Sequence, residues 1–328
     1  MKIRRSLFAA TLLLGGCFSS DSNHTVVSQK YIHKYGFDVS EKEWQDREQD
    51  GQIVSMLSNG VKITRSYENG LLHGTTLQTF PHSQVIEKLF VYDMGTLLKE
   101  MLYDPNGIPI SEEVYEFEDR KILTLWDEKG APISIEEYDG ELLVDGKFYT
   151  PTHELEGRIE NGFGERYKRD RSGNLLSRES IEDGIIAART NFHPNGQIHS
   201  ISQYHDYQLH GEQKKFTATG KPLMDLSWNH GILDGTKIVY RNGQKIAEIP
   251  YVNGQRHGTE KHFDDIQNLV AEIEWKNDKK HGESRYFTDE RVEKEWFFKG
   301  GSVTEKKFET LSNREQFIAD LNLESDYE

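Results

Sequence analysis

Four histidines at one position of a repeated motif are the residues whose type and spacing could bind a metal: His73, His210, His257 and His281. Zinc needs its protein ligands at about 2.0–2.1 Å from the ion. If each repeat adds two strands to a sheet, equivalent positions of adjacent repeats lie about 10 Å apart and cannot share an ion. His205 is closer to His210, but the sequence shows no third ligand. We therefore expect no metal site and no cofactor, and expect these histidines to satisfy turn groups.

Side chains that could act in catalysis do not combine in this sequence. Nucleophilic catalysis needs an activated nucleophile beside a base, and no Gly-x-Ser-x-Gly motif is present. Paired carboxylates occur at Glu112-Glu113 and Glu136-Glu137. Neighbours on a strand point to opposite faces of a sheet, so neither pair forms a site. The sequence therefore predicts no catalytic residue and no enzyme.

The single cysteine, Cys17, lies in a setting suited to a different chemistry. A basic start precedes the apolar run of residues 7–14, which is too short to span a bilayer of about 30 Å. The next residues, Leu14-Gly15-Gly16-Cys17, resemble the lipobox of bacterial lipoproteins. The resemblance implies a signal peptide over 1–16 and acylation of Cys17, which would bind the chain to a lipid bilayer. Two or three acyl chains hold a protein stably on a membrane.

The residues after Cys17 bear on location. Phe18 stands where Asp is the usual inner-membrane retention signal of Gram-negative lipoproteins, so the resemblance favours the outer membrane if the source is Gram-negative. Residues 17–40 are polar and unpatterned, and we expect a linker there. No later run approaches 18 apolar residues. We therefore expect a lipid-anchored body in the bacterial cell envelope.

An internal repeat of about 23 residues sets the elements of that body. Tyr251-Val-Asn-Gly254-Gln-Arg-His-Gly258 is the clearest copy, and Tyr67-Glu-Asn-Gly70-Leu-Leu-His-Gly74 repeats it closely. Ten of the twelve leading residues are Trp or Tyr, and the exceptions are Ile159 and Ile181. The leading residues are 21 to 25 positions apart, at 44, 67, 92, 115, 138, 159, 181, 204, 228, 251, 275 and 296. This phase indicates about twelve structural repeats.

Turn residues give each repeat its local structure. Asn-Gly between short alternating runs is a strong hairpin signal, because type I′ turns need positive φ at both central residues. A second turn follows in each repeat, as in Phe192-His-Pro-Asn-Gly196. Each repeat is therefore predicted to form two short strands and two turns. The aromatic and glycine positions expected to carry this structure are Tyr67, Gly70, Gly74, Tyr204, Gly211, Trp228, Gly231, Gly235, Tyr251, Gly254, Gly258, Trp275 and Gly282.

The repeat resembles the MORN-variant family, and most of all its YwqK-type members, over about residues 44–300. The motif is weak over residues 92–190. The resemblance implies an all-β fold in which antiparallel hairpins stack into an elongated, curled sheet over residues 41–308. Repeats that contact only their neighbours need no central core. This fits a chain with 35% hydrophobic but 11% aromatic residues.

The last residues, 309–328, have a different pattern. Ser312-Asn-Arg-Glu315 reads as a capping box, with Phe317, Ile318 and Leu321 following at helical spacing. We expect a short capping helix over about residues 313–322, followed by an acidic tail. At the other end, charged residues 41–50 are expected to protect the first strand edge.

The net charge of the chain limits the classes of partner that it can bind. The net charge is −15, and loss of the three basic residues of the leader makes it −18. This argues against nucleic acid, which needs a basic footprint. Residues 112–145 hold twelve acids and three bases. They could be a solvated acidic face that opposes edge pairing, a docking surface for a basic protein, or a place of loose Ca²⁺ binding. The acids do not follow EF-hand spacing, so we predict no metal site.

The sequence as a whole favours a non-enzymatic protein-interaction or scaffold module, held at the membrane by acylated Cys17. Two alternatives stay open. The YwqK-type resemblance implies an antitoxin or immunity protein, and some relatives are credited with lipid binding by their repeats. The acidic balance disfavours contact with anionic headgroups.

Overall fold

The computed structural model describes residues 24–47, 49–117, 119–288 and 291–325. The proposed signal peptide and Cys17 lie outside these residues. The chain divides into two compact units, Met1–Gly107 and Ile108–Glu328. The described ranges contain 27 strands and two helices, and the strand pairings are antiparallel. The prediction of an all-β chain of antiparallel hairpins with a C-terminal helix is therefore confirmed.

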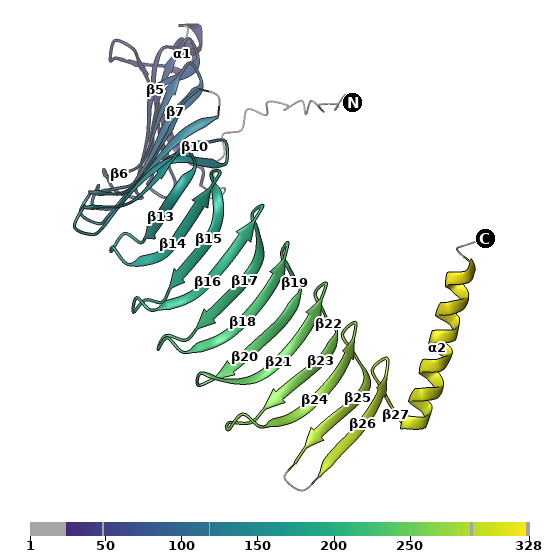
Figure 1. The fold of residues 1–328 in the computed structure, drawn as a ribbon. Helices are drawn as coiled ribbons and strands as arrows, with labels where there is room; N and C mark the ends of the chain where they lie inside the picture. Colours follow the sequence, from purple (N-terminus) through teal and green to yellow (C-terminus); the bar gives the residue numbers. More distant parts are fainter. Residues whose placement is uncertain (1–23, 48, 118, 289–290, 326–328) are drawn as a thin grey trace. The chain divides into compact units, whose positions relative to one another are not determined.

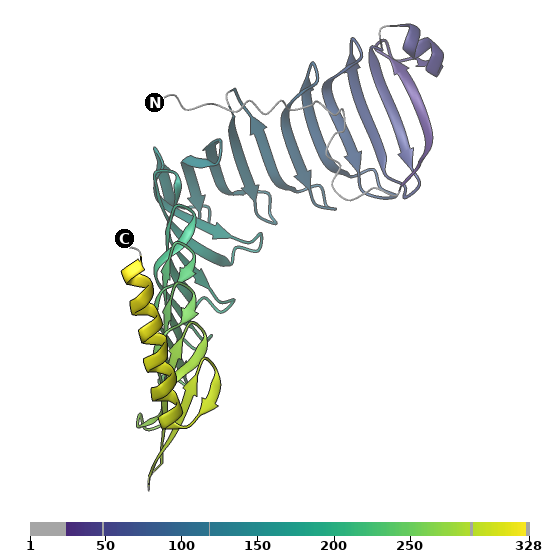
Figure 2. The same ribbon diagram turned by 90° about the vertical axis from the view of Figure 1, so that its right-hand side faces the viewer.

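The N-terminal unit is an open sheet (Figure 2). From β3 to β7 each strand pairs with the next strand of the chain, whereas the first three strands are in a different order. There, β1 lies between β2 and β3. The elements of this unit are β1 (Val26–His33), β2 (Asp38–Val39), α1 (Glu41–Asp46), β3 (Gly51–Leu57), β4 (Lys62–Glu68), β5 (Leu71–Thr79), β6 (Ile86–Asp93) and β7 (Thr96–Tyr103).

The predicted linker over residues 17–40 is wrong for its second half, since β1 and β2 lie within it. Strand β1 is mostly exposed, so a polar sequence suffices to form it and gives no apolar alternation to read. Its Tyr31 packs on Trp44 of α1, and Trp44 also meets the ring of Tyr67 at 6.0 Å. Trp44 is 4% exposed. The helix thus packs on the first strands through the apolar Trp44 rather than through its charged residues.

The C-terminal unit continues the same hairpin pattern (Figure 1). Its elements are β8 (Pro109–Tyr115), β9 (Arg120–Trp126), β10 (Pro132–Asp139), β11 (Leu142–Tyr149), β12 (Leu155–Glu160), β13 (Phe163–Arg169), β14 (Leu175–Glu182), β15 (Ile185–Phe192), β16 (Ile198–His205), β17 (Gln208–Phe216), β18 (Pro222–Asn229), β19 (Ile232–Leu233), β20 (Gly235–Arg241), β21 (Gln244–Val252), β22 (Gln255–Arg256), β23 (Gly258–Phe263), β24 (Leu269–Lys276), β25 (Lys279–Phe287), β26 (Val292–Phe298), β27 (Gly301–Val303) and α2 (Glu305–Ser325).

The repeat positions chosen from the sequence lie at corresponding places in these hairpins. Each leading residue is the next-to-last residue of the first strand of its hairpin: Tyr67, Tyr204, Trp228, Tyr251 and Trp275. The turn glycines that follow them, and the glycines four residues further on, have positive φ that L-residues rarely adopt. The glycines concerned are Gly70, Gly74, Gly211, Gly231, Gly235, Gly254, Gly258 and Gly282. The repeat therefore encodes a turn followed by a kink in the returning strand.

A small hydrophobic core lies in the C-terminal unit. Leu143, Phe148, Ile159 and Ile181 are buried together, and Tyr138 is among the side chains packed against them. Two of these four residues are the isoleucines that interrupt the run of aromatic leading residues. The sequence changes at these positions because here the side chains pack inside a core.

The C-terminal helix α2 begins earlier than predicted, at Glu305. The N–H of Phe308 donates to the carbonyl of Thr304 at 2.9 Å, and the N–H of Lys307 donates to Thr304 Oγ1 at 3.4 Å. Ser312 is therefore inside the helix, and the capping box read there does not start it. Phe308 packs on Trp296 with ring centroids 5.1 Å apart, which holds the first turns of the helix against β26.

Neither described helix is both long enough and apolar enough to cross a membrane.

Candidate functional site

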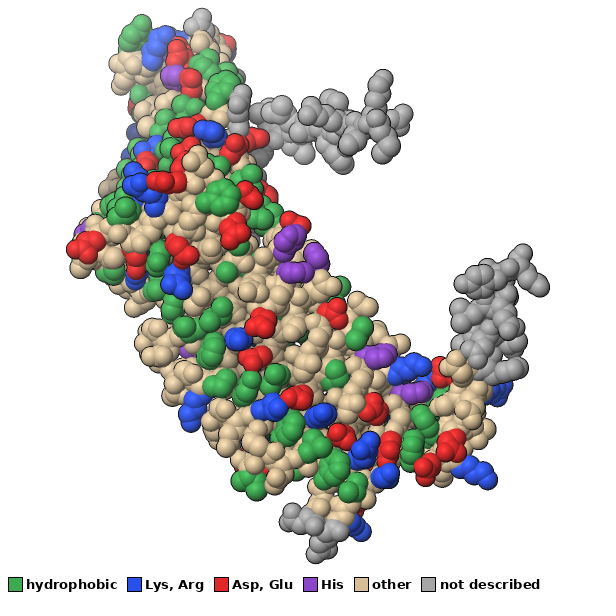
Figure 3. Space-filling view, in the orientation of Figure 1, with side chains coloured by type: hydrophobic (Ala, Val, Ile, Leu, Met, Phe, Trp, Pro, Cys, Tyr) green, Lys and Arg blue, Asp and Glu red, His purple; other side chains and the backbone are tan. Residues whose placement is uncertain are grey.

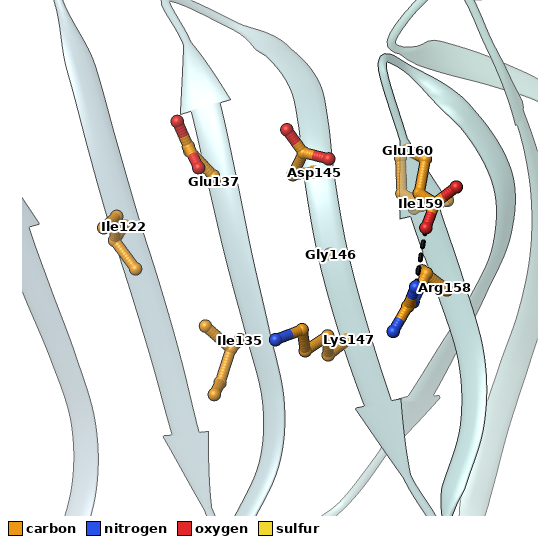
Figure 4. Close-up of a pocket in the computed structure, with 9 residues that line it drawn as sticks. All are labelled: Ile122, Ile135, Glu137, Asp145, Gly146, Lys147, Arg158, Ile159 and Glu160. Carbon is orange, nitrogen blue, oxygen red and sulfur yellow. Dashed lines mark hydrogen bonds and ion pairs between the residues drawn. The ribbon is translucent and has the colours of Figure 1, made fainter.

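A groove of about 420 Å³ opens on one face of β9 to β12 in the C-terminal unit (Figure 4). The residues that line it are Ile122, Ile135, Glu137, Asp145, Gly146, Lys147, Arg158, Ile159 and Glu160. Strand pairing sets their order, because directly paired residues share a face. Glu137 pairs with Asp145, and Lys147 pairs with both Ile135 and Arg158.

The groove separates its charges into two rows. Figure 4 shows the carboxylates of Glu137, Asp145 and Glu160 at one end, and Lys147 with Arg158 at the other. The rows are two residues apart along a strand, which is about 6.5–7 Å. Like charges directly opposite one another destabilise a strand pair. Two neighbouring cross-strand pairs, Glu137–Asp145 and Lys147–Arg158, each place like charges opposite one another. Such an arrangement lowers stability, and it is better suited to binding a charged ligand.

Two ion pairs made by groove residues offset part of this repulsion. Arg158 Nη1 lies 2.7 Å from Glu160 Oε1, and Arg120 Nη1 lies 3.4 Å from Glu137 Oε1. Both pairs are accessible to solvent, so each contributes little to folding. These side chains can therefore exchange their partners for charged groups of a ligand.

Acidic hairpin ends lie beside the carboxylate row. The N–H of Gly140 donates to the carbonyl of Asp119 at 3.1 Å, which joins the β10–β11 turn to the β8–β9 turn. Glu116, Asp119, Asp139 and Glu141 are all exposed at these two turns. Phe117 stands among them with 91% of its surface exposed. We call these five residues the acidic tip.

The acid-rich segment of residues 112–145 does not form one face. Glu136 is 2% exposed and points away from the groove that holds its neighbour Glu137. Asp127 lies in a turn, where burial alone would raise its pKa. The N–H groups of Ala131 and Lys129 donate to its carboxylate and bring the pKa below its usual value. Part of the acidity is therefore structural, and the remainder gathers at the acidic tip and the groove.

The opposite face of β10 and β13 to β15 carries a buried charge cluster. Arg166 Nη2 donates to Glu136 Oε2 at 2.6 Å, and Arg189 Nε donates to Glu179 Oε1 at 2.8 Å. Arg166 Nη1 also lies 3.5 Å from Glu179 Oε2. Lys168 is next to these groups, so the cluster consists of two acids and three bases.

Burial shifts the pKa of two groups in or against this cluster. It raises the pKa of Tyr138, and the negative charge of Glu136, which accepts the hydrogen bond of Tyr138, raises it further. Burial lowers the pKa of Lys168, and the positive charge of Arg166 acts in the same direction. Such shifts often mark functional sites. Here both glutamates are paired with arginines, and none of these side chains lines the groove. We therefore interpret the cluster as structural.

The four repeat histidines serve the turns, as expected. Nδ1 of His73 accepts the N–H of Met94 at 3.5 Å, Nδ1 of His281 accepts the N–H of Lys299 at 3.3 Å, and His210 acts in the same way. His257 Nδ1 lies 3.2 Å from Asn277 Oδ1. Among the described residues, no group of three or more His, Cys, Asp or Glu side chains could hold a metal ion.

Sequence reasoning missed Arg166, Glu179 and Lys168, because no motif surrounds them. A weak signal was present in the glycines of neighbouring strands. A Cβ on Gly157 would lie 2.5 Å from the Tyr167 ring, and one on Gly164 would lie 2.1 Å from the carbonyl oxygen of Arg158. Glycine at such strand positions indicates a close approach of backbones.

Residues 188–206 match the family model described as MORN repeat variant. The match covers most of the β15–β16 hairpin, so the repeat unit of that description is one hairpin of this sheet. No curated protein matches the chain.

Two solved structures are similar to parts of the chain. BamB from Moraxella catarrhalis is 10% identical over 75% of this chain and 82% of its own, with a TM-score of 0.15. A porin-like protein from Bacteroides uniformis is 9% identical over 76% of this chain and 89% of its own, with a TM-score of 0.16. TM-scores this low carry no argument about fold or function.

Proposed function

We propose that this chain is a non-enzymatic interaction module of the bacterial cell envelope, anchored by acylated Cys17, whose repeats dock a partner protein. The observation that carries the proposal is the acidic tip. Four exposed carboxylates lie at the same two adjoining turns as the almost fully exposed Phe117, beside a groove with its own carboxylate row. Aromatic side chains such as Phe are enriched at protein interfaces relative to the rest of the protein surface.

The partner that suits this surface is a basic segment with an apolar side chain. Its Lys or Arg residues would face the acidic tip, and its apolar residue would cover Phe117. Exposed charges of this kind mainly raise the association rate and are screened by salt. We therefore expect binding that weakens steeply between low and physiological ionic strength.

Proximity labelling in the native envelope tests the proposal with a charge-reversal variant. In E116K/E141K the full chain should fold normally, since both positions are exposed, but recover its partner at least tenfold less. The control E154K/D265K makes the same charge change at exposed positions elsewhere and should recover the partner as wild type does. Equal recovery by both variants would refute docking at the acidic tip.

The anchor is tested separately by Cys17→Ala. We expect this variant to leave the membrane fraction and lose incorporation of labelled fatty acid. If it stays membrane-bound, the lipoprotein proposal fails. If the released form floats with liposomes, the repeats themselves bind lipid. If loss of the gene is lethal unless a neighbouring gene is also lost, the chain is an antitoxin or immunity protein.

A further inference from the structure

The groove over β9 to β12 orders its charges by their distance from the acidic tip. On β10, Asp139 lies at the tip, and Glu137 is two residues further from the turn. On β11, Asp145 pairs with Glu137, and Lys147 is two residues beyond Asp145. Side chains two residues apart on a strand share a face of the sheet. A line along the strands from the tip therefore meets acid, acid and then base.

The two charges on β11 are not neutralised by their neighbours in the groove. Asp145 lies between Glu137 and Glu160, and Lys147 has Arg158 opposite it on the next strand (Figure 4). Among the nine residues that line the groove, the ion pair drawn in Figure 4 joins Arg158 to Glu160. Asp145 and Lys147 are both exposed. Each can therefore pair with a ligand's charge without first breaking a contact within the groove.

Apolar side chains lie on the β9 and β10 side of these charges. Ile122 pairs with Glu137, and Ile135 pairs with Lys147. Both isoleucines line the groove and are partly buried. The methylene groups of a long charged side chain can cover such a surface while its charged end reaches further. The groove thus suits a ligand with Lys, Arg or Glu side chains, and its volume of about 420 Å³ is enough for several groups.

Charges elsewhere in this unit are not sorted in this way. Figure 3 shows acidic and basic side chains intermixed over the strands toward the C-terminal end of the visible face. On β23 to β25, Glu272 pairs with Lys261 on one side and with Arg285 on the other. Opposite charges across strands stabilise a sheet. The two like-charged rows of the groove are therefore not a general feature of this sheet.

An extended peptide has the spacing that the groove requires. Its alternate side chains point to the same side and lie about 6.5–7 Å apart. The carboxylate row and the row of Lys147 and Arg158 are also two strand residues apart, so the two spacings match. On a helix, side chains two positions apart point to different sides. A peptide laid along the strands can therefore place one charge over each row only when it is extended.

We propose that the groove binds an extended segment of the partner protein in which an acidic residue follows a basic residue two positions away. The basic residue faces the carboxylate row, and the acidic residue faces Lys147 and Arg158. This specificity rests on the proposed docking of a basic segment at the acidic tip. The side of the segment that faces the sheet would then read basic, basic and acidic at alternate positions, starting from the tip.

Fluorescence anisotropy with labelled peptides and the full chain in detergent tests the proposal. The mixed peptide has nine residues, with leucine at position 1, lysine at positions 3 and 5, glutamate at position 7 and threonine elsewhere. The basic peptide has lysine at position 7. At low ionic strength, where exposed charges are screened least, wild type should bind the mixed peptide at least tenfold more tightly than the basic peptide. Moving the glutamate to position 6 keeps the composition but turns its charge away from the groove, and should abolish this advantage.

A charge-reversal variant separates recognition from damage to the fold. K147E should reverse the preference, so that the basic peptide binds more tightly than the mixed peptide, which loss of structure would not produce. The matched control K221E makes the same charge change at an exposed lysine outside the groove and should keep the wild-type preference.

Three results would overturn recognition of an acidic residue by the groove. They are equal or tighter binding of the basic peptide by wild type, an unchanged preference in K147E, and no binding of the mixed peptide below 1 mM. Docking at the acidic tip is judged separately, by the recovery of the partner with E116K/E141K. A basic peptide that binds wild type as tightly as the mixed peptide would therefore remove the groove from the interface and leave the tip in it.

Discussion

Nη2 of Arg166 lies 2.6 Å from Oε2 of Glu136, although their strands, β13 and β10, are separated by β11 and β12. On a flat sheet three strand spacings amount to about 14 Å. Strands β11 and β13 contact one another although β12 lies between them, so the sheet curls there, toward the face that carries the buried charge cluster. The arginine and the glutamate join the two sides of that curl.

Removal of Glu179 should destabilise this region strongly. Glu179 is fully buried and accepts from Arg189 and Ser177. In Glu179→Ala two arginines lose a buried partner, and breaking a buried ion pair costs about 3–5 kcal/mol. Hydrogen exchange of the β13–β15 amides measures the loss. The control is Glu160, which forms an exposed ion pair with Arg158. Glu160→Ala should lower the free energy of unfolding by less than about 1 kcal/mol. Equal effects would contradict the structural role of the cluster.

A methyl group at Gly157 should prevent the curl. Its Cβ would lie 2.5 Å from the Tyr167 ring and 2.7 Å from the carbonyl oxygen of Glu165. Overpacking of this kind costs about 1–3 kcal/mol, and more when backbone must move. Gly301→Ala is a matched control, because its Cβ meets nothing closer than 3.6 Å and its φ is not positive. Thermal unfolding of the full chains should separate the two variants.

Neutralising Lys168 should stabilise the cluster. Its lowered pKa means that the unfolded chain binds the proton more tightly, so stability rises with pH toward the ordinary value of Lys. Lys168→Met removes the surplus positive charge and should gain stability at pH 7, by less than about 1 kcal/mol because solvent screens part of the side chain. The variant should also lose the rise between pH 7 and 10. An exposed lysine, Lys221, serves as control, and a destabilised Lys168→Met would contradict the reasoning.

Acid should loosen the first hairpins through Asp50. The ammonium group of Lys34 and the N–H of Asn69 donate to its carboxylate at 2.8 and 2.6 Å and hold its pKa below the usual value. This stabilisation, about 2 kcal/mol for hydrogen bonds to a charged group, is present above the unfolded pKa near 3.9. It is lost as pH falls through the lower folded value.

Hydrogen exchange of residues 51–79 between pH 6 and pH 3 measures this loss. Asp50→Asn should already be destabilised at pH 6 and change less on acidification than wild type. An equal acid response in both proteins would show that other carboxylates control the region.

Most of the fold could be predicted from the sequence because it depends on local turn residues. Asn-Gly pairs such as Asn253-Gly254 specify their turn without help from distant residues, because the conformation they need is costly for other residue types. The same pairs fixed the phase of the repeat.

Elements that depend on contacts between residues distant in the sequence could not be predicted from it. Strand β1 forms because β3 pairs with it, and α2 starts early because Phe308 meets Trp296. The charge cluster arises from the curl of the sheet, which brings side chains of strands that are not neighbours into contact. The acidic tip could be predicted only in part. The composition shows where the acidic residues are concentrated, but the strand register decides which of them are exposed.

Strands β12 and β13 are joined by only two residue pairs, Ile159–Gly164 and Glu160–Phe163, whereas six pairs join β13 to β14. Cooperativity in a repeat protein passes only between neighbours, so it is weakest at such a junction. The chain should therefore melt in blocks, with a calorimetric enthalpy larger than the van't Hoff enthalpy of any one transition. A single melting temperature would then describe only one block of this protein.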